Sequence, residues 1–346
     1  MTEQLMIDIT YACNMRCLHC YNESGVDRRY IETSKLLNIA QQIAAIQPKG
    51  VCISGGETLL RYKDILLFTK KVKEVTQGNT IVNMVTNGLL LDKEKAINLK
   101  SAGIDAIQIS LDGASANTYE WLRLYKGSFE IVCNAIRTVV SSGIDCMVSC
   151  LFTKKNYNEF DDIIRLCLDL KVSRLRLQPL MMMGRADINL KEFQLNDTEY
   201  RNLVQKIYRI NRKLKADNKK LIVEWGDPVN HLIIHKNNAN IKNNSFGIDA
   251  YGNYNLSPYL PVTFGNIDEF NLKEEEERLE NIWSTKFIQY IIKDIYNTDD
   301  LNLNKVNSLL PKINSDEYID VDVNEIMKDR YTSIEQLINI FRKKRK

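Results

Sequence analysis

Three cysteines near the start of the chain are the residues whose type and spacing suggest chemistry most directly. Cys13, Cys17 and Cys20 follow the spacing C-x3-C-x2-C, and His19 places an aromatic ring just before the last of them. Three thiolates on one short loop can ligate three irons of a cubic iron–sulfur cluster. The fourth iron would then have no protein ligand and would be free to bind a substrate or a cofactor.

A zinc site and a disulfide framework are the alternatives for these thiols. A structural zinc site usually has four ligands arranged in two pairs, and the sequence contains no second cysteine pair of that kind. The remaining cysteines are scattered in apolar surroundings typical of core residues: Cys52, Cys133, Cys146, Cys150 and Cys167. His19 is too close in sequence to Cys17 and Cys20 to be a comfortable fourth ligand. A disulfide framework is not expected in a chain of 346 residues without a signal peptide.

The cysteine motif and a second motif resemble those of the radical S-adenosylmethionine (SAM) superfamily. The three cysteines match its C-x3-C-x-aromatic-C signature, and Ser54-Gly55-Gly56-Glu57 matches its Gly-Gly-Glu motif, with Thr58 where proline is usual. The resemblance runs from about residue 5 to at least residue 187. In that family, SAM chelates the open iron of a [4Fe–4S] cluster through its amino and carboxylate groups. The reduced cluster then splits SAM to a 5′-deoxyadenosyl radical, which removes a hydrogen atom from the substrate.

The resemblance also implies which residues hold SAM. It assigns the turn at Gly55 and Gly56 to the amino group, Ser110 and Asp112 to the ribose or carboxylate, and Arg123 to the carboxylate. A guanidinium suits a carboxylate because its donors form a planar fork. The complete set expected at SAM is His19, Gly55, Gly56, Glu57, Thr86, Asn87, Ser110, Asp112 and Arg123. Asn-Gly and Asp-Gly are ordinary turn dipeptides when taken singly, so the assignment depends on their order after successive strands.

Strands and helices alternate through the first half of the sequence. Strands are predicted at residues 5–10, 51–54, 80–85, 106–111, 145–152 and 173–178. Helices are predicted from residue 33 onward and at 62–75, 92–101, 129–141 and 157–170. Six strand–helix units imply an α/β fold with a parallel sheet, which right-handed crossovers would curl into a barrel or partial barrel. The family resemblance favours a partial (β/α)6, TIM-like barrel over a doubly wound sheet.

The motifs are expected to gather on one face of this fold. Each follows a different predicted strand: the cysteines the first, Gly55-Gly56-Glu57 the second, Thr86-Asn87-Gly88 the third, and Ser110 to Gly113 the fourth. Loops after the carboxyl ends of parallel strands share one face, where α/β sites are built. Glycines in such a turn let the backbone approach a ligand that a Cβ would block.

The second half resembles the SPASM extension of peptide- and protein-modifying members of the family. A hairpin is predicted at 246–256 around Tyr251-Gly252, followed by Gly265-Asn266-Ile267 and a helix carrying Ile282-Trp283. Cysteines in a SPASM extension hold auxiliary clusters, but this sequence has no cysteine after Cys167. We therefore expect a C-terminal SPASM-like extension without its metal sites, with an ordinary hairpin and covering helix as the alternative. The expected domains are a radical SAM core at 1–190, a degenerate SPASM-like substrate region at 191–298 and a tail of unknown role at 299–346, with a last helix at 334–341.

The missing auxiliary clusters restrict the expected reaction. Without one, a net two-electron oxidation needs another electron acceptor, so redox-neutral outcomes such as epimerisation or rearrangement are favoured. Epimerases of the family quench the substrate radical with a cysteine thiol. Cys150, near the end of the fifth predicted strand, is the candidate hydrogen donor, and an ordinary buried core cysteine is the alternative.

Composition bears on partners and compartment. The net charge of +3 gives no argument for nucleic acid, and no apolar run approaches the roughly 20 residues of a membrane span. The basic end, residues 342–346, is expected to be a solvated tail. Free thiols without an export signal predict a cytoplasmic protein, and a reduced cluster would need the same reducing compartment.

Together these features predict a cytoplasmic radical SAM enzyme that acts on a ribosomally made peptide or a protein side chain, by epimerisation, cross-linking or rearrangement. No leader-recognition module precedes the first strand, so a peptide is expected to be recognised by the second half or by a separate protein. An electron donor such as flavodoxin or ferredoxin is expected as a partner. The alternatives are a radical SAM enzyme for a small molecule, such as a sugar, nucleotide or cofactor precursor, and an iron–sulfur or zinc protein that only binds a partner.

Overall fold

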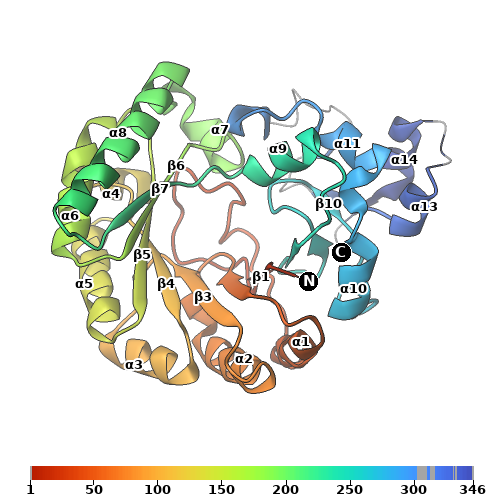
Figure 1. The fold of residues 1–346 in the computed structure, drawn as a ribbon, viewed down its shortest axis with the longest axis horizontal. Coiled ribbons are helices and arrows are strands. Elements are labelled where there is room, and N and C mark those ends of the chain that lie inside the picture. The colour runs from red at the N-terminus through yellow and green to blue at the C-terminus, as the bar shows by residue number, and fades with distance from the viewer. Residues whose placement is uncertain (1, 302–309, 312–315, 330, 332, 345–346) are drawn as a thin grey trace.

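The core of the fold is a sheet whose strands curve around the middle of the molecule (Figure 1). The computed structural model describes residues 2–301, 310–311, 316–329, 331 and 333–344. Strands β1 to β6 span Gln4–Asp8, Gly50–Ser54, Ile81–Thr86, Ala106–Ser110, Asp145–Leu151 and Arg174–Gln178. Each of these strands pairs in parallel with the next one along the chain. The six predicted strands and the partial (β/α)6 barrel are therefore confirmed.

Helices cover the outer face of this sheet (Figure 1). The predicted ones are observed as α1 (Thr33–Ile46), α2 (Tyr62–Val75), α3 (Lys93–Ala102), α5 (Ser128–Ser141) and α6 (Phe160–Asp169). Local signals set their ends: Asp92 caps α3 by accepting a hydrogen bond from Lys95 N at 2.8 Å, and Gly103 ends it in the left-handed region. A further helix, α4 (Ala116–Arg123), was not predicted and carries Arg123 toward the site.

Strand residues alternate between an apolar outer layer and a polar inner face. In β2, Val51 and Ile53 are fully buried in the core that the helices complete, whereas Cys52 and Ser54 have the opposite parity. The register pairs Asp8 with Ser54, and Ser110 with Ser149. Polar side chains from four strands therefore lie at the carboxyl-end rim of the inner face.

Three strands that follow residue 190 extend the same sheet. They are β7 (Ile222–Trp225) beside β6, β8 (Ser245–Ile248) beside β1, and β9 (Tyr254–Asn255), which is antiparallel to β8. The hairpin predicted around Tyr251-Gly252 is confirmed, but its parallel pairing with β1 was not predicted. The division at residue 190 stays a prediction, although the sheet continues past it.

The remaining elements pack around the hairpin. The helices are α7 (Arg185–Asn189), α8 (Asp197–Ala216), α9 (Asn230–Asn237), α10 (Leu272–Leu279), α11 (Lys286–Ile292), α13 (Val323–Met327) and α14 (Ile334–Phe341). A small second sheet joins β10 (Val262–Thr263), β11 (Glu317–Asp320) and β12 (Arg342–Lys344). The last predicted helix is confirmed as α14, and β11 ties the tail to β10. Arg345 and Lys346 of the basic end lie outside the described residues.

The described helices do not include one that could span a membrane. Among the described residues, no helix has both the length and the apolar character needed to cross a bilayer.

Candidate functional site

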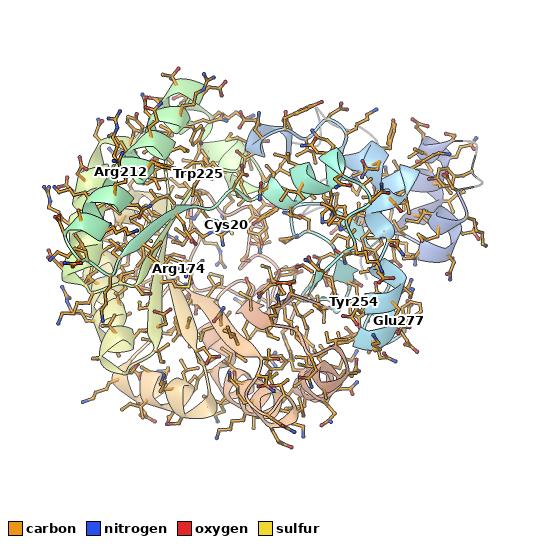
Figure 2. The ribbon with its side chains drawn as sticks, viewed as in Figure 1. Cys20, Arg174, Arg212, Trp225, Tyr254 and Glu277 are labelled. Atoms are coloured by element: carbon orange, nitrogen blue, oxygen red, sulfur yellow. The ribbon has the colours of Figure 1, made fainter. Side chains whose placement is uncertain are left out.

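The three predicted cluster cysteines lie on one loop that follows β1. We call residues 11–29 the cysteine loop; its ends are joined by the bridge between Thr10 and Tyr30. Figure 2 shows Cys20 near the middle of the molecule, inside the curve of the sheet, whereas Arg212 and Glu277 lie toward the outside. Cys17 is buried, and Cys13 and Cys20 are partly exposed. The loop thus presents three free thiols on the inner side of the barrel.

Two arginines hold the carbonyl groups of the cysteine loop. Arg16 donates from Nη1 to Cys13 O at 2.9 Å and from Nη2 to Gly25 O at 2.7 Å. From the start of α7, Arg185 donates from Nε to Cys17 O at 2.8 Å and from its backbone N to Cys20 O at 3.0 Å. The sequence did not identify either residue as part of the site. These bonds fix the backbone that carries the thiols, so the loop is preorganised.

The Gly-Gly-Glu turn after β2 is bonded directly to the cysteine loop. Gly56 N donates to Thr10 O at 2.7 Å, and Glu57 N donates to Ala12 O at 2.8 Å. A Cβ on Gly55 would lie 2.3 Å from Thr10 O, and one on Gly56 would lie 2.3 Å from Ala12 O. The two glycines therefore let the turn after β2 pack closely against a neighbour, as glycine permits. That neighbour is the backbone leading into and through the cysteine motif.

We expect Gly56→Ala to displace the cysteine loop, because its Cβ would meet backbone atoms that cannot rotate away. The free energy of unfolding of the apoprotein should fall by about 3 kcal/mol, and iron bound after reconstitution should fall with it. Urea titration and iron analysis measure the two effects. Gly143→Ala is the control: its φ is +75° with no atom near the added Cβ, so it should cost about 1 kcal/mol and retain iron. Equal losses in both variants would contradict the steric argument.

Glu57 links the motifs after β2 and β3 rather than presenting a free carboxylate. Its Oε1 accepts hydrogen bonds from Leu59 N at 2.9 Å and Thr86 Oγ1 at 2.6 Å, and its Oε2 accepts one from Asn87 N at 2.8 Å. Asn87 Nδ2 in turn donates to Asn14 Oδ1 on the cysteine loop at 2.8 Å. Burial raises the pKa of Glu57, and these hydrogen bonds oppose that rise. Glu57, Thr86 and Asn87 are thus brought together beside the thiols.

A buried ion pair stands next to Cys17. Arg123 Nε donates to Asp112 Oδ2 at 2.6 Å, and its Nη1 lies 3.7 Å from Cys17 Sγ. Asp112 Oδ1 also accepts a hydrogen bond from Leu151 N at 2.8 Å. Burial lowers the pKa of the guanidinium, but the Asp112 carboxylate together with Cys17 and Tyr119 raises it above its usual value. Arg123, predicted to grip SAM, is therefore a fixed positive charge at the second cluster thiol.

His19 and Ser110 complete the rim on the inner face. Burial, with help from Arg123, lowers the pKa of His19 to about 4, so its ring is neutral at physiological pH. Its Nδ1 is buried with no hydrogen-bond partner among the described residues. Ser110 ends β4 opposite Ser149, whose hydroxyl donates to Gln178 Oε1 at 2.8 Å. These predicted residues share one face with the cysteine loop.

Cys150 is not brought into this site. It is fully buried in the apolar core and pairs with Leu177, so its side chain has the opposite parity to Ser149. Burial raises the pKa of its thiol well above the usual value. Cys150 therefore lies in the outer, helix-facing layer of the sheet, and its role as hydrogen donor stays a prediction that this position does not support. The side chain of Cys52 in β2 lies instead on the inner face of the sheet, and burial raises the pKa of its thiol to about 12.

The residues present fit an iron–sulfur cluster with bound SAM. Three free thiols stand on one loop, Arg123 Nη1 lies 3.7 Å from Cys17 Sγ, and His19 offers an unpartnered buried nitrogen. Burial raises the pKa of Cys13 to about 11, so ligation there would displace a proton. Within the described part of the chain, no three His, Cys, Asp or Glu groups are placed to hold a single metal ion.

Comparison with known proteins agrees with this geometry. Residues 7–167 match the model of the radical SAM superfamily. This part of the chain, slightly less than half of it, is similar to that superfamily, which uses a [4Fe–4S] cluster and SAM.

Individual relatives show how far the likeness extends. The chain is 32% identical to mycofactocin maturase MftC of Mycolicibacterium smegmatis over 175 residues, which is 49% of this chain and 43% of that protein. It is 24% identical to the AdoMet-dependent heme synthase of Methanosarcina barkeri, over 79% of this chain and 81% of that protein. The fold resembles crystalline SuiB of Streptococcus suis, with a TM-score of 0.66 and 16% identity, over 96% of this chain and 75% of SuiB. The match to MftC thus covers less than half of that protein. The structural similarity to SuiB, in contrast, also includes the second half of this chain.

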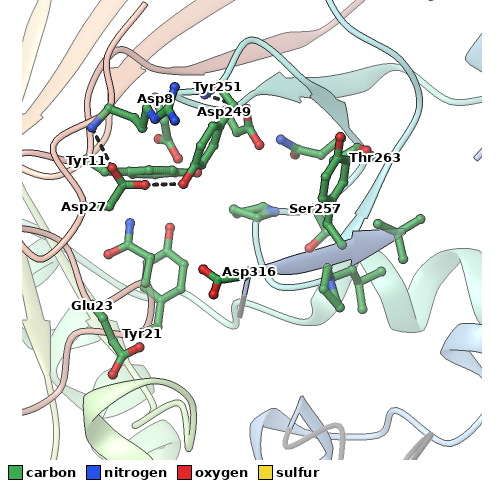
Figure 3. Close-up of a pocket in the computed structure, with 18 of the residues that line it drawn as sticks. Asp8, Tyr11, Tyr21, Glu23, Asp27, Asp249, Tyr251, Ser257, Thr263 and Asp316 are labelled. Carbon is green, nitrogen blue, oxygen red and sulfur yellow. Dashed lines mark hydrogen bonds between the residues drawn. The ribbon is translucent and has the colours of Figure 1, made fainter. Parts of the chain in front are cut away.

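A cavity of about 420 Å³ opens beside the cysteine loop (Figure 3). Its wall is formed by the end of β1, the cysteine loop, the turn between β8 and β9, and the segment leading into β11. Asp8 lines it at the carboxyl end of β1 and is only 6% exposed. A second cavity of about 310 Å³ also includes Asp8, together with Arg176. The first cavity lies between the cysteine loop and segments that follow residue 245.

The carboxyl group of Asp8 has an unusually high pKa. Burial, and next the negative charge of Asp249, raise its pKa to about 7, while a hydrogen bond from Ser54 opposes the rise. Its Oδ1 has no hydrogen-bond partner among the described residues. Other titratable groups that interact with Asp8 are Tyr21, Cys52 and Tyr259, and Arg176 interacts with the latter two.

We expect the stability of the apoprotein to fall as pH rises between the pKa of Asp8 in the unfolded chain and its pKa in the folded chain. Because its pKa is about 7 in the folded chain and 3.8 for an aspartate exposed to water, the folded state binds the extra proton and loses this advantage between about pH 4 and pH 7. The stability of Asp8→Asn relative to wild type should therefore increase by on the order of 3 kcal/mol between pH 5 and pH 8. Urea titrations at the two pH values measure this difference. The same difference between variant and wild type at both values would contradict it.

Proposed function

We propose that this protein is a radical SAM enzyme that modifies a peptide or a protein side chain. Cys13, Cys17 and Cys20 would hold the [4Fe–4S] cluster. The observation that carries the proposal is the preorganised loop of three free thiols, bonded at Gly56 and Glu57 to the turn after β2. When bound together, the cluster and SAM supply one-electron cleavage of SAM and removal of a hydrogen atom from the substrate.

The chain's own residues position and shield these groups. Arg16 and Arg185 hold the loop carbonyls, so that the thiols keep one geometry. Arg123 places its guanidinium beside Cys17, with Nη1 3.7 Å from Sγ. The neutral ring of His19 offers Nδ1 to a bound ligand, and Ser110 offers a hydroxyl from the rim.

A peptide substrate is supported by the nature of the similar proteins. SuiB has been crystallised with the precursor peptide SuiA, and MftC is named a maturase. The cavity between the cysteine loop and the second half, about 420 Å³, suits a side chain with part of its backbone. We propose that the second half recognises the peptide, with or without a separate leader-binding protein, and that flavodoxin or ferredoxin supplies the electron in a reducing cytoplasm.

The activity is tested without knowledge of the substrate. Protein reconstituted with iron and sulfide under anaerobic conditions is supplied with SAM and dithionite, and 5′-deoxyadenosine is quantified. The proposal expects its formation at a rate that depends on the cluster. Failure of fully iron-loaded protein to form 5′-deoxyadenosine would contradict it.

A small-molecule substrate is the second candidate. It is favoured by the similarity to the heme synthase, which covers 81% of that protein. The two are separated by coexpressing the enzyme with short peptides encoded near its gene and recording peptide masses with and without it. A mass or stereochemical change in a peptide supports the first proposal, and a change confined to a small metabolite supports the second.

A partner-binding protein without catalysis is the third candidate. Zinc instead of about four irons per purified chain would support it. Elemental analysis of anaerobically purified protein decides this point before any substrate is known.

A further inference from the structure

The cavity beside the cysteine loop has a strongly one-sided charge. Of the described residues that line it, the carboxylates are Asp8, Glu23, Asp27, Asp249 and Asp316, against the single guanidinium of Arg29. Figure 3 shows the carboxylates drawn around the cavity, two of them beside the rings of Tyr11 and Tyr251. A cleft lined by one sign of charge concentrates ligands of the opposite sign.

Asp8 is the group that points to a ligand. It is nine-tenths buried, lines the cavity, and leaves Oδ1 without a hydrogen-bond partner in the part of the chain that the structure describes. A buried carboxylate without a paired donor is costly, and the cost is relieved when a cation binds it. Asp8 therefore offers Oδ1 to a hydrogen-bond donor at this position.

Asp249 faces Asp8 and is prevented from turning away. Its Oδ1 accepts hydrogen bonds from Tyr251 N and Asn253 N, each at 2.9 Å, in the turn between β8 and β9. Its negative charge acts on Asp8 strongly enough to raise the pKa of that carboxyl. Two carboxyl groups held near each other favour a cation between or beside them.

Aromatic rings line the same space. Tyr11 and Tyr251 pack edge to face with centroids 5.9 Å apart, and the guanidinium of Arg29 lies 5.4 Å from the centre of the Tyr251 ring. Tyr21 and Tyr318 also line the cavity. Rings of this kind attract an organic cation through their faces, in addition to the attraction of the carboxylates.

An organic cation fits this lining better than a metal ion. Among the described residues no three His, Cys, Asp or Glu side chains converge on one point where an ion could sit. The carboxylates are instead distributed around a cavity of about 420 Å³. This distribution suits an extended side chain that ends in a charge and contacts rings along its length.

We propose that this cavity receives a positively charged side chain of the substrate, an alkylammonium or guanidinium group, with Asp8 as its principal partner and Asp249 as the second carboxylate. This inference rests on the proposed peptide substrate and specifies its chemistry. It also gives the C-terminal tail a role, because Asp316 and Tyr318 form part of the cavity wall.

The test uses three probes of one backbone, the Nα-acetyl N-methylamides of lysine, arginine and norleucine. Their dissociation constants are measured by saturation-transfer-difference NMR on iron-loaded protein saturated with SAM, which keeps SAM itself from occupying the cavity. The lysine or arginine probe should bind roughly tenfold or more tightly than norleucine. This preference should increase from pH 6 to pH 8, as Asp8 loses its proton. A preference for lysine alone identifies an ammonium site, and one for arginine alone a guanidinium site.

Matched variants assign the preference to the cavity. Asp8→Asn should reduce it roughly tenfold, whereas Asp161→Asn, which makes the same charge change on the exposed surface of α6, should leave it unchanged. Asp249→Asn keeps an oxygen that can accept the same two turn hydrogen bonds, so it tests the charge even if Asp8→Asn fails to fold. Equal affinity for all three probes, or an unchanged preference in both cavity variants, would overturn the proposal.

The same samples separate this inference from the proposed function. Cleavage of SAM to 5′-deoxyadenosine by the wild-type protein is measured without any probe. Cleavage without a cation preference overturns the cation site alone. A cation preference without cleavage by iron-loaded protein overturns the proposed enzyme activity and leaves the site as a binding site.

Discussion

Replacing Cys17 with serine is expected to remove the iron–sulfur cluster and with it the cleavage of SAM. Cys17 is buried, and its Sγ lies 3.7 Å from Arg123 Nη1. A serine hydroxyl does not ionise at neutral pH and is a poor ligand for iron. Iron should fall from about four to near zero per chain. Cleavage should fall below roughly one hundredth of wild type, since even changes behind a metal ligand cost up to about that much.

Iron analysis, the visible absorption of the cluster and 5′-deoxyadenosine formation measure this effect. Cys150→Ala is the matched control, because it removes a thiol from the outer layer of the same barrel. It should retain iron and SAM cleavage, although the cavity that it leaves will lower stability. Retention of a full cluster by Cys17→Ser would contradict the assignment of the loop. Loss of the cluster in Cys150→Ala, in protein that remains folded, would contradict the placement of Cys150.

Asp112→Asn is expected to have the largest effect on stability among single charge changes at the site. Asp112 and Arg123 form an ion pair whose side chains are 2% and 9% exposed. Removing the carboxylate leaves a buried guanidinium without a counter-charge, which costs about 3–5 kcal/mol. Asparagine keeps an acceptor for Leu151 N, so the loss reports mainly the charge. Urea unfolding of the apoprotein at pH 7 measures it.

A double-mutant cycle isolates this pair from its surroundings. Arg123→Met alone should also destabilise the apoprotein, and adding Asp112→Asn to it should cost clearly less than in the wild type. Asp161→Asn on the exposed surface of α6 should change the free energy of unfolding by no more than about 0.5 kcal/mol. A loss below about 1 kcal/mol in Asp112→Asn would show that Arg123 finds another partner.

The elements of the barrel could be predicted because their signals are local. Strands buried on one face and helices with repeated apolar positions leave a periodic pattern, and α2 has the predicted bounds of Tyr62–Val75. Helix α4 was missed because its eight residues carry no such repeat over a long window. The pairing of β8 with β1 was also missed, since it joins segments about 240 residues apart and no local pattern encodes it.

The residues of the site also divide into those with a local sequence signal and those without one. The cysteines, the glycines and Glu57 could be named from their order along the chain, whereas Arg16, Arg185 and Asp8 could not. An arginine that binds carbonyl groups, or an aspartate that faces a cavity, has no sequence signature, because its partners come from distant segments. The role of Glu57 likewise emerged only from its three hydrogen bonds across the ends of β2 and β3.

The sequence by itself determined the spacing of the thiol loop and the order of strands and helices in the barrel, and it carried the resemblance to the radical SAM superfamily, because these depend on residue type and on patterns along the chain. Only the tertiary structure decided that Cys150 faces the outer layer and that Asp8 and Asp249 line the same cavity, where their charges interact. The physical reason is that strand parity and register, together with the closure of the sheet by β8, set which side chains share a space.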